Sequence, residues 1–261
     1  MKKNIIIFIF LTIFSRLVLS LSGMAEPPFA DMLYVLAFGL PILVGIPLAE
    51  RDRRRREEIA GVKERWASLL SLRPERAVML LPLVFVSVAA IFFVAYLGYL
   101  LISILGGELS GGISGSLFEL LLTSALLPSV TEEMLFRLLP MKLVLPYSRK
   151  WTVILSAVSF SVFHLNYEQY LYTFVAGIIF ILTDIAFESI LPSMMMHLAN
   201  NVASIVWMRL GESDTYSLAF VLTLIALAAV SMIFIIVKRR KYAVLFAPMR
   251  YGDRNGKDNN V

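Results

Sequence analysis

The sequence contains no cysteine and only two histidines, and few of its residues are charged. The absence of cysteine excludes a disulfide framework, a thiolate metal site and a cysteine nucleophile. Charged residues make up 16% of the 261 positions, against about a quarter in ordinary soluble domains. Hydrophobic residues make up 59%, and the mean hydropathy is +0.79. This balance excludes a soluble globular enzyme, which needs a polar surface, and it also excludes intrinsic disorder.

Long apolar segments are present instead, and the breaks between them are short. A transmembrane helix needs about 20 apolar residues. Eight segments are candidates: 5–22, 30–49, 77–105, 117–144, 151–165, 170–190, 192–210 and 215–237. We therefore predict an all-α, polytopic membrane protein with about eight transmembrane helices.

The basic residues are concentrated in two polar segments. Residues 50–76 hold nine basic and six acidic residues, and residues 238–261 hold seven basic and two acidic. The positive-inside rule places such segments in the cytoplasm, which also makes both termini cytoplasmic. The predicted outer loops contain neither Lys nor Arg: 23–29, 106–116, 166–169 and 211–214. We interpret the basic segments as juxtamembrane and expect no nucleic-acid partner.

This pattern divides the chain into three parts. Residues 1–116 form the N-terminal helices with the basic segment 50–76, residues 117–210 form a helical core, and residues 211–261 form the last span and a basic tail. The first 22 residues also have the layout of a signal peptide, but Arg16 interrupts the apolar run and favours a retained helix.

Polar residues inside the core spans form three groups. Ionisable side chains are costly in a membrane and usually face a bundle interior or a cavity. The groups lie at 131–137, 160–164 and 197–201, and they include both histidines of the chain. We therefore expect these three groups to meet at one functional site.

Helical spacing separates the two neighbouring glutamates of the first group. Glu133 and Arg137 are four residues apart with the acid first, which favours an ion pair. Glu132 is turned about 100° away and is left without a local partner, as a general base would be. Pro128 is expected to open this helix and Pro192 to open the helix of His197, as broken helix ends beside a cavity do.

The polar residues of the other two groups complete a set for adding water to a peptide carbonyl. A carboxylate takes a proton from water, and an imidazole such as His164 holds that water. His197 and Asn201, which share a helix face, donate hydrogen bonds to an oxyanion, and Asn200 competes for the amide role. A structural role is the alternative for each residue taken singly, as a tie between helices. We assign no role to Asp184 and Glu188, which we place at the inner boundary.

The three motifs are Glu-Glu-x-x-x-Arg, Phe-x-x-x-His and His-x-x-x-Asn, each on its own apolar segment. Together they resemble the CPBP intramembrane protease family, which includes type II CAAX prenyl endopeptidases and bacterial relatives linked to bacteriocin processing or immunity. The resemblance covers about residues 117–210. It implies an eight-helix protein of a prokaryotic plasma membrane whose active site opens towards the cytoplasm. It also implies catalytic roles for Glu132, His164, His197 and Asn201, and supporting roles for Glu133, Arg137 and Phe160.

In these roles Glu132 and His164 activate the water, His197 and Asn201 stabilise the oxyanion, and Glu133 with Arg137 supports Glu132. The depths expected for the two histidines in the membrane are hard to reconcile with a shared site. At 1.5 Å per residue, His164 lies roughly 20 Å from the inner boundary but His197 only about 10 Å.

We expect no metal cofactor, since the sequence has no His-Glu-x-x-His helix; a zinc site of Glu132, His164 and His197 is the alternative. The expected partners are membrane lipids and a membrane-associated or lipidated substrate, and prenylation stays open. Two other functions compete: a secondary transporter, which predicts an internal repeat that is not visible, and a non-catalytic membrane protein related to bacteriocin immunity.

Overall fold

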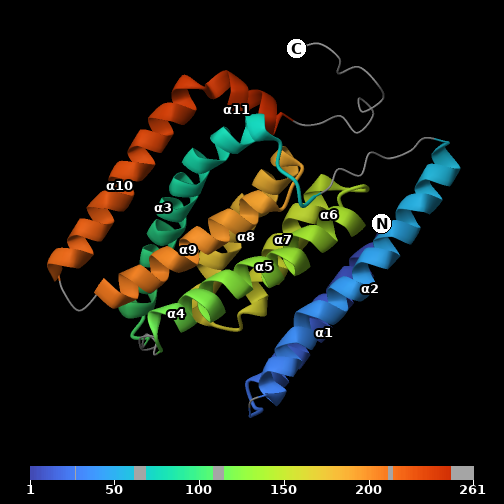
Figure 1. Ribbon diagram of the computed structural model, residues 1–261, viewed down its shortest axis with the longest axis horizontal. Helices are drawn as coiled ribbons and strands as arrows, with labels where there is room; N and C mark the ends of the chain where they lie inside the picture. Colours follow the sequence, from blue (N-terminus) through green and yellow to red (C-terminus); the bar gives the residue numbers. More distant parts are fainter. Residues whose placement is uncertain (27, 62–68, 108–114, 211–213, 248–261) are drawn as a thin grey trace.

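The structure is a computed structural model that describes residues 1–26, 28–61, 69–107, 115–210 and 214–247. Every regular element within these ranges is helical, which confirms the predicted all-α class (Figure 1). The long helices are α1 Lys2–Ser22, α2 Phe29–Ala60, α3 Pro74–Ile104, α7 Arg149–Phe163, α8 Tyr167–Phe187, α9 Leu191–Leu210 and α10 Asp214–Val237. The short helix α11, Arg239–Phe246, lies inside the predicted basic tail.

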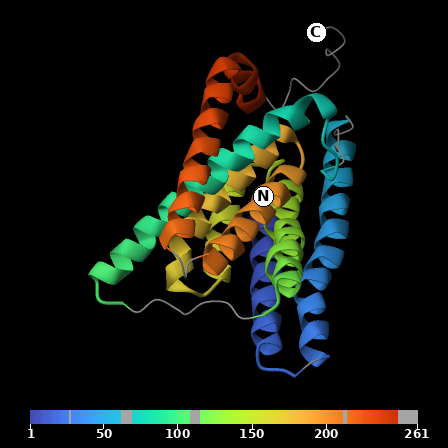
Figure 2. The ribbon, with the colours of Figure 1, turned by 60° about the vertical axis from the view of Figure 1, so that its left-hand side comes forward.

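Helices α1 and α2 lie side by side at one edge of the molecule in both ribbon views (Figures 1 and 2). The sequence predicts that the second span ends at residue 49, but α2 continues to Ala60. Charge pairs at helical spacing explain the extension, because Arg53 pairs with Glu50 and Glu57, and Arg56 pairs with Asp52. The basic segment thus begins as a helix that extends beyond the apolar run.

The segment 117–143 is one continuous helical run of mixed geometry. It consists of α4 Leu117–Leu120, the π-helix η1 Leu121–Leu126, α5 Leu127–Glu133, the π-helix η2 Met134–Leu138 and α6 Leu139–Leu143. Short π-helical stretches are rare and are found mostly at functional sites. Pro128 lies in the first turn of α5, as predicted, but the helical run is not broken there, because η1 leads directly into α5. Pro192 lies in the first turn of α9, also as predicted.

Helices α7 and α8 approach each other closely at the centre of the protein. A Cβ atom on Gly177 of α8 would lie only 2.8 Å from the Cα atom of Ala157 on α7, so glycine is required at this crossing. Beside it lies an aromatic core in which the ring of Phe136 packs against the rings of Phe160 and Phe163 at 5.5 and 4.9 Å. This core fixes the inner face of α7 relative to η2.

Within the described ranges, five helices are long and apolar enough to cross a membrane: α1, α2, α3, α8 and α10. Helix α7 has 15 residues, fewer than the roughly 20 needed, and the run 117–143 carries the in-span charges. A polytopic membrane protein agrees with this set, whereas the count of eight spans and the cytoplasmic termini stay predictions.

Candidate active site

A buried ionic cluster joins the first and third polar groups. Glu133 and Arg137 are both fully buried, and the Arg137 Nε atom lies 3.0 Å from the Glu133 Oε2 atom. The predicted ion pair is therefore confirmed. The other carboxylate oxygen, Oε1, lies 2.8 Å from the His197 Nδ1 atom. Glu133 thus contacts His197 of α9 directly, whereas the sequence suggested that it supports Glu132.

The guanidinium of Arg137 is held on several sides. Its Nη1 atom donates to the Ser156 Oγ atom at 3.0 Å and to the Phe136 carbonyl at 3.3 Å, and its Cζ atom lies 4.6 Å from the centre of the Phe160 ring. Ser156 also donates to the Phe136 carbonyl, at 2.6 Å. That carbonyl lies four residues before Pro140, which has no N–H to offer it. Ser156 belongs to none of the sequence motifs, so its hydrogen bond with Arg137 could not be predicted from the sequence.

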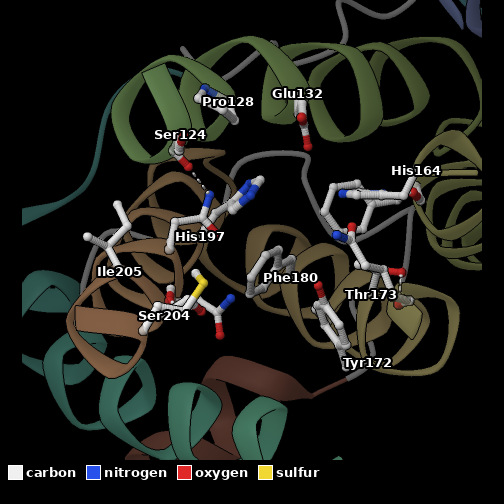
Figure 3. A pocket seen from close by; sticks show the side chains of 16 residues that line it. Ser124, Pro128, Glu132, His164, Tyr172, Thr173, Phe180, His197, Ser204 and Ile205 are labelled. Carbon is white, nitrogen blue, oxygen red and sulfur yellow. Dashed lines mark hydrogen bonds between the residues drawn. The ribbon is translucent and has the colours of Figure 1, made fainter. Parts of the chain in front are cut away.

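The four predicted catalytic residues line one pocket of about 250 Å³. Figure 3 shows Glu132, His164 and His197 directed into it from different helices. The depths estimated from the sequence, about 20 and about 10 Å at 1.5 Å per residue, do not keep the two histidines apart in the fold. The lining is completed by Ser124, Pro128, Phe160, Gln169, Tyr172, Thr173, Ala176, Phe180, Asn200, Asn201, Ser204, Ile205 and Met208.

Glu132 and His164 each have a polar atom at this pocket that is available to a substrate or a water molecule. The Glu132 Oε2 atom is buried and has no hydrogen-bond partner. The His164 Nδ1 atom lies 2.8 Å from the Phe160 carbonyl. A carbonyl only accepts, so Nδ1 carries the proton, and in the neutral ring the Nε2 atom is an acceptor. The ring of Phe160 lies edge-on to His164 at 5.1 Å and to His197 at 5.6 Å, which places it between the two histidines as a packing residue.

The two candidate amides of α9 differ in their partners. Asn201 Nδ2 donates to the Ser124 carbonyl at 3.1 Å (Figure 3). Ser124 lies four residues before Pro128, which has no N–H for an α-helical bond to this carbonyl. The Asn200 Oδ1 atom is buried and has no hydrogen-bond partner. Asn201 therefore anchors α9 to η1, while Asn200 presents an unpaired polar atom.

Asp184 lies in the last turn of α8 and is buried inside the protein. Its side chain is fully buried, and its Oδ1 atom accepts a hydrogen bond from the Ser193 backbone N–H at 2.9 Å. Ser193 lies in the first turn of α9, whose N–H groups have no helical acceptor. Asp184 thus fixes the start of the helix that carries His197. Glu188, in contrast, ends α8 with a left-handed backbone (φ 56°) and lies 3.7 Å from Arg76.

Comparison with protein families agrees with this geometry. Residues 114–203 match the family model described as type II CAAX prenyl endopeptidase, Rce1-like. This segment belongs to that protease family. It contains all seven residues named from the motifs, so the family resemblance read from the sequence is confirmed. A search of curated proteins and a search of solved structures gave no match.

The zinc alternative was tested against the side chains of this Rce1-like segment and the rest of the described chain. No three His, Asp or Glu side chains in that part of the protein are arranged so that they could hold a metal ion. Glu132, His164 and His197 line the same pocket but are not arranged there as a ligand set. The metal-independent mechanism stays a prediction.

Proposed function

We propose that the Rce1-like segment is an intramembrane endopeptidase in which Glu132 activates water. One observation carries this proposal. Of two adjacent glutamates, Glu133 is buried between a guanidinium and an imidazole, while Glu132 keeps an unpaired oxygen at a pocket that both histidines share. The paired carboxylate supports its neighbours, and the unpaired one is available as a base.

The first step needs a water molecule between Glu132 and His164. The carboxylate takes one proton from the water, while the lone pair of His164 Nε2 accepts a hydrogen bond from its other O–H and orients it. The resulting hydroxide adds to the peptide carbonyl carbon. The proton held by Glu132 then passes to the leaving amine, so that one peptide and one water give a carboxylic acid and an amine.

The oxyanion formed in this step needs donors that are already in place. Asn201 uses one of its two amide hydrogens on the Ser124 carbonyl, and we assign the second to the oxyanion. His197 donates through Nε2, which requires a ring protonated on both nitrogens. The Glu133 carboxylate beside Nδ1 is placed to balance that positive charge.

The substrate we propose is a membrane-associated polypeptide. A peptide bond is cleaved in an extended segment, whose backbone polar groups have no helical partners and need polar side chains in a membrane. Gln169, Tyr172 and Ser204 offer such groups along the pocket beside apolar Phe180 and Ile205. No feature of this lining requires a lipid anchor on the substrate.

Cleavage by the purified protein in liposomes tests the proposal. Lipid-modified peptides and single-span peptides would be offered separately, with and without a chelator, and products identified by mass. We expect cleavage that resists the chelator and is lost in Glu132→Gln. Glu119→Gln is the matched control, because Glu119 is exposed on α4 and does not line the pocket. Full activity of Glu132→Gln would exclude the mechanism, and chelator-sensitive activity would restore the metal alternative.

A further inference from the structure

One face of helix α8 lines the pocket with residues of unequal size. The lining residues of α8 are Gln169, Tyr172, Thr173, Ala176 and Phe180. Residues four apart are neighbours on a helix surface, so Tyr172, Ala176 and Phe180 follow one another along this face. Two of them carry large rings, and the one between them carries a single methyl group. Helix α8 therefore presents a recess between two aromatic rings to the pocket.

The recess offers space to a side chain of a bound peptide. Tyr172 and Phe180 are eight residues apart, which corresponds to a rise of about 12 Å along the helix. Ala176 is 4% exposed and still lines the pocket, so the cavity reaches down to its methyl group. Figure 3 shows both rings on the side of the pocket opposite Glu132. A side chain between the rings therefore points away from the proposed base.

The backbone beneath the recess cannot move back to make it deeper. The next residue, Gly177, lies at the crossing of α7 and α8, where an added Cβ atom would lie 2.8 Å from the Ala157 Cα atom. An interior packed this closely does not accept added volume without strain. A larger residue at position 176 would consequently project into the pocket, so the alanine sets the depth of the recess.

The recess adjoins the residues proposed to act on the peptide bond. The centre of the Phe180 ring lies 5.9 Å from that of the His197 ring and 6.4 Å from that of the Phe160 ring. The proposed mechanism places the scissile carbonyl between Glu132 and His197. A peptide in that position brings the side chain of a residue beside the cleaved bond to the recess.

We propose that Tyr172, Ala176 and Phe180 form a subsite for an apolar substrate side chain beside the cleaved bond, a step that rests on the proposed peptidase activity. The walls are aromatic rings and the floor is a methyl group, and a charged side chain is costly to bury there without a partner. A leucine or methionine side chain fills such a recess, whereas alanine buries less apolar surface in it. The substrate class is therefore a membrane-associated polypeptide with a leucine-sized apolar residue next to the bond.

A leucine scan of the substrate tests the subsite. Fluorescent single-span peptides in liposomes would carry either alanine or leucine at one position at a time, and the bond cut by the full chain would be identified by mass. Binding of the same peptides would be measured on Glu132→Gln protein. Ala176→Leu fills the recess, and Ala176→Val fills it partly with a smaller change in volume. Val175→Leu is the matched control, because Val175 lies on α8 but does not line the pocket.

At one position beside the cut bond we expect the wild type to favour leucine over alanine by about tenfold or more in kcat/KM, and Glu132→Gln protein to favour it in affinity. Ala176→Leu should lose this preference, Ala176→Val should reduce it, and Val175→Leu should retain it. Each preference is a ratio within one preparation, so a smaller folded fraction does not alter it.

Two results would overturn the subsite: a leucine preference that is unchanged in both Ala176 variants, or one that is absent from the wild type. The peptidase proposal is judged separately. If the preference is found in binding and no peptide is cleaved, the peptidase proposal fails while the subsite stands. If peptides are cleaved with no preference at any position, the subsite fails while the peptidase proposal stands.

Discussion

The ionic cluster of Glu133, Arg137 and His197 shares His197 with the pocket, but the carboxylates of the two regions differ in their partners. In the cluster the Glu133 carboxylate is occupied on both oxygens, by Arg137 and by His197. In the pocket, Glu132 and Asn200 each keep a buried oxygen without a partner. Both regions bury atoms without a hydrogen-bond partner, such as Arg137 Nη2 in the cluster, so the difference between them lies in charge: the Glu133 carboxylate is paired with Arg137 and lies beside His197. The comparison separates a region that maintains the structure from a region that acts on a ligand.

The two adjacent glutamates allow the sharpest test of this difference. We expect Glu132→Gln to lower the cleavage rate by about 10²–10⁴-fold, the usual contribution of a general base, with little change in thermal stability. Cleavage of a liposome-reconstituted substrate and tryptophan-detected unfolding in detergent would be measured on the same preparation. A large loss of stability in Glu132→Gln would place this residue in the structural region.

Glu133→Gln tests the ionic cluster, and here we expect the main loss to be in stability. It leaves the fully buried Arg137 without its carboxylate, which costs about 3–5 kcal/mol when a buried pair is broken. The midpoint of unfolding in detergent should fall sharply. Removal of both charges in Glu133→Gln with Arg137→Met is the control, and we expect it to recover part of that loss. Equal stability of Glu133→Gln and the wild type would contradict the assignment of a structural role.

The asparagines provide a smaller contrast within one turn of α9. Asn201→Ala removes both the proposed oxyanion donor and the bond to the Ser124 carbonyl. Its cleavage rate should fall by about 10²–10³-fold, and its unfolding free energy should fall by about 0.5–1.5 kcal/mol. Asn200→Ala should retain more activity than Asn201→Ala and be at least as stable as the wild type. Greater inactivation by Asn200→Ala would transfer the oxyanion role to Asn200.

Pro128→Ala is expected to have the smallest effect. Alanine supplies an N–H to the Ser124 carbonyl, and a hydrogen bond of this kind adds about 0.5–1.5 kcal/mol to stability. The carbonyl has a second lone pair, so Asn201 keeps part of its anchor and activity should fall less than in Asn201→Ala. Thermal unfolding and cleavage rates measure the two effects, and a Pro128→Ala protein less stable than the wild type would show that the proline itself stabilises the start of α5.

Local spacing explains why so much of the site was visible in the sequence. The Glu133–Arg137 pair depends only on two residues four apart on a helix. The split between Glu133 and Glu132 depends on the angle between consecutive residues. The end of the apolar run at residue 49 does not mark the end of α2, because local charge pairs continue the helix to Ala60.

Contacts between distant segments were not predictable in this way. The bond from His197 to Glu133 joins residues 64 positions apart, and the bond from Asn201 to Ser124 joins residues 77 positions apart. No sequence motif includes Ser156, Ser193 or Asp184. These residues lie near the site because α7, α8 and α9 pack beside the 117–143 run.

The sequence by itself determined that the chain is helical and largely apolar, that Glu133 pairs with Arg137, and which residues carry the protease motifs. These features follow from composition and from distances within a single helix. Only the tertiary structure decided that Glu133 contacts His197, that Asn201 donates to the Ser124 carbonyl, and that the three polar groups line one pocket. Each of these depends on which helices pack together and on the direction in which each runs.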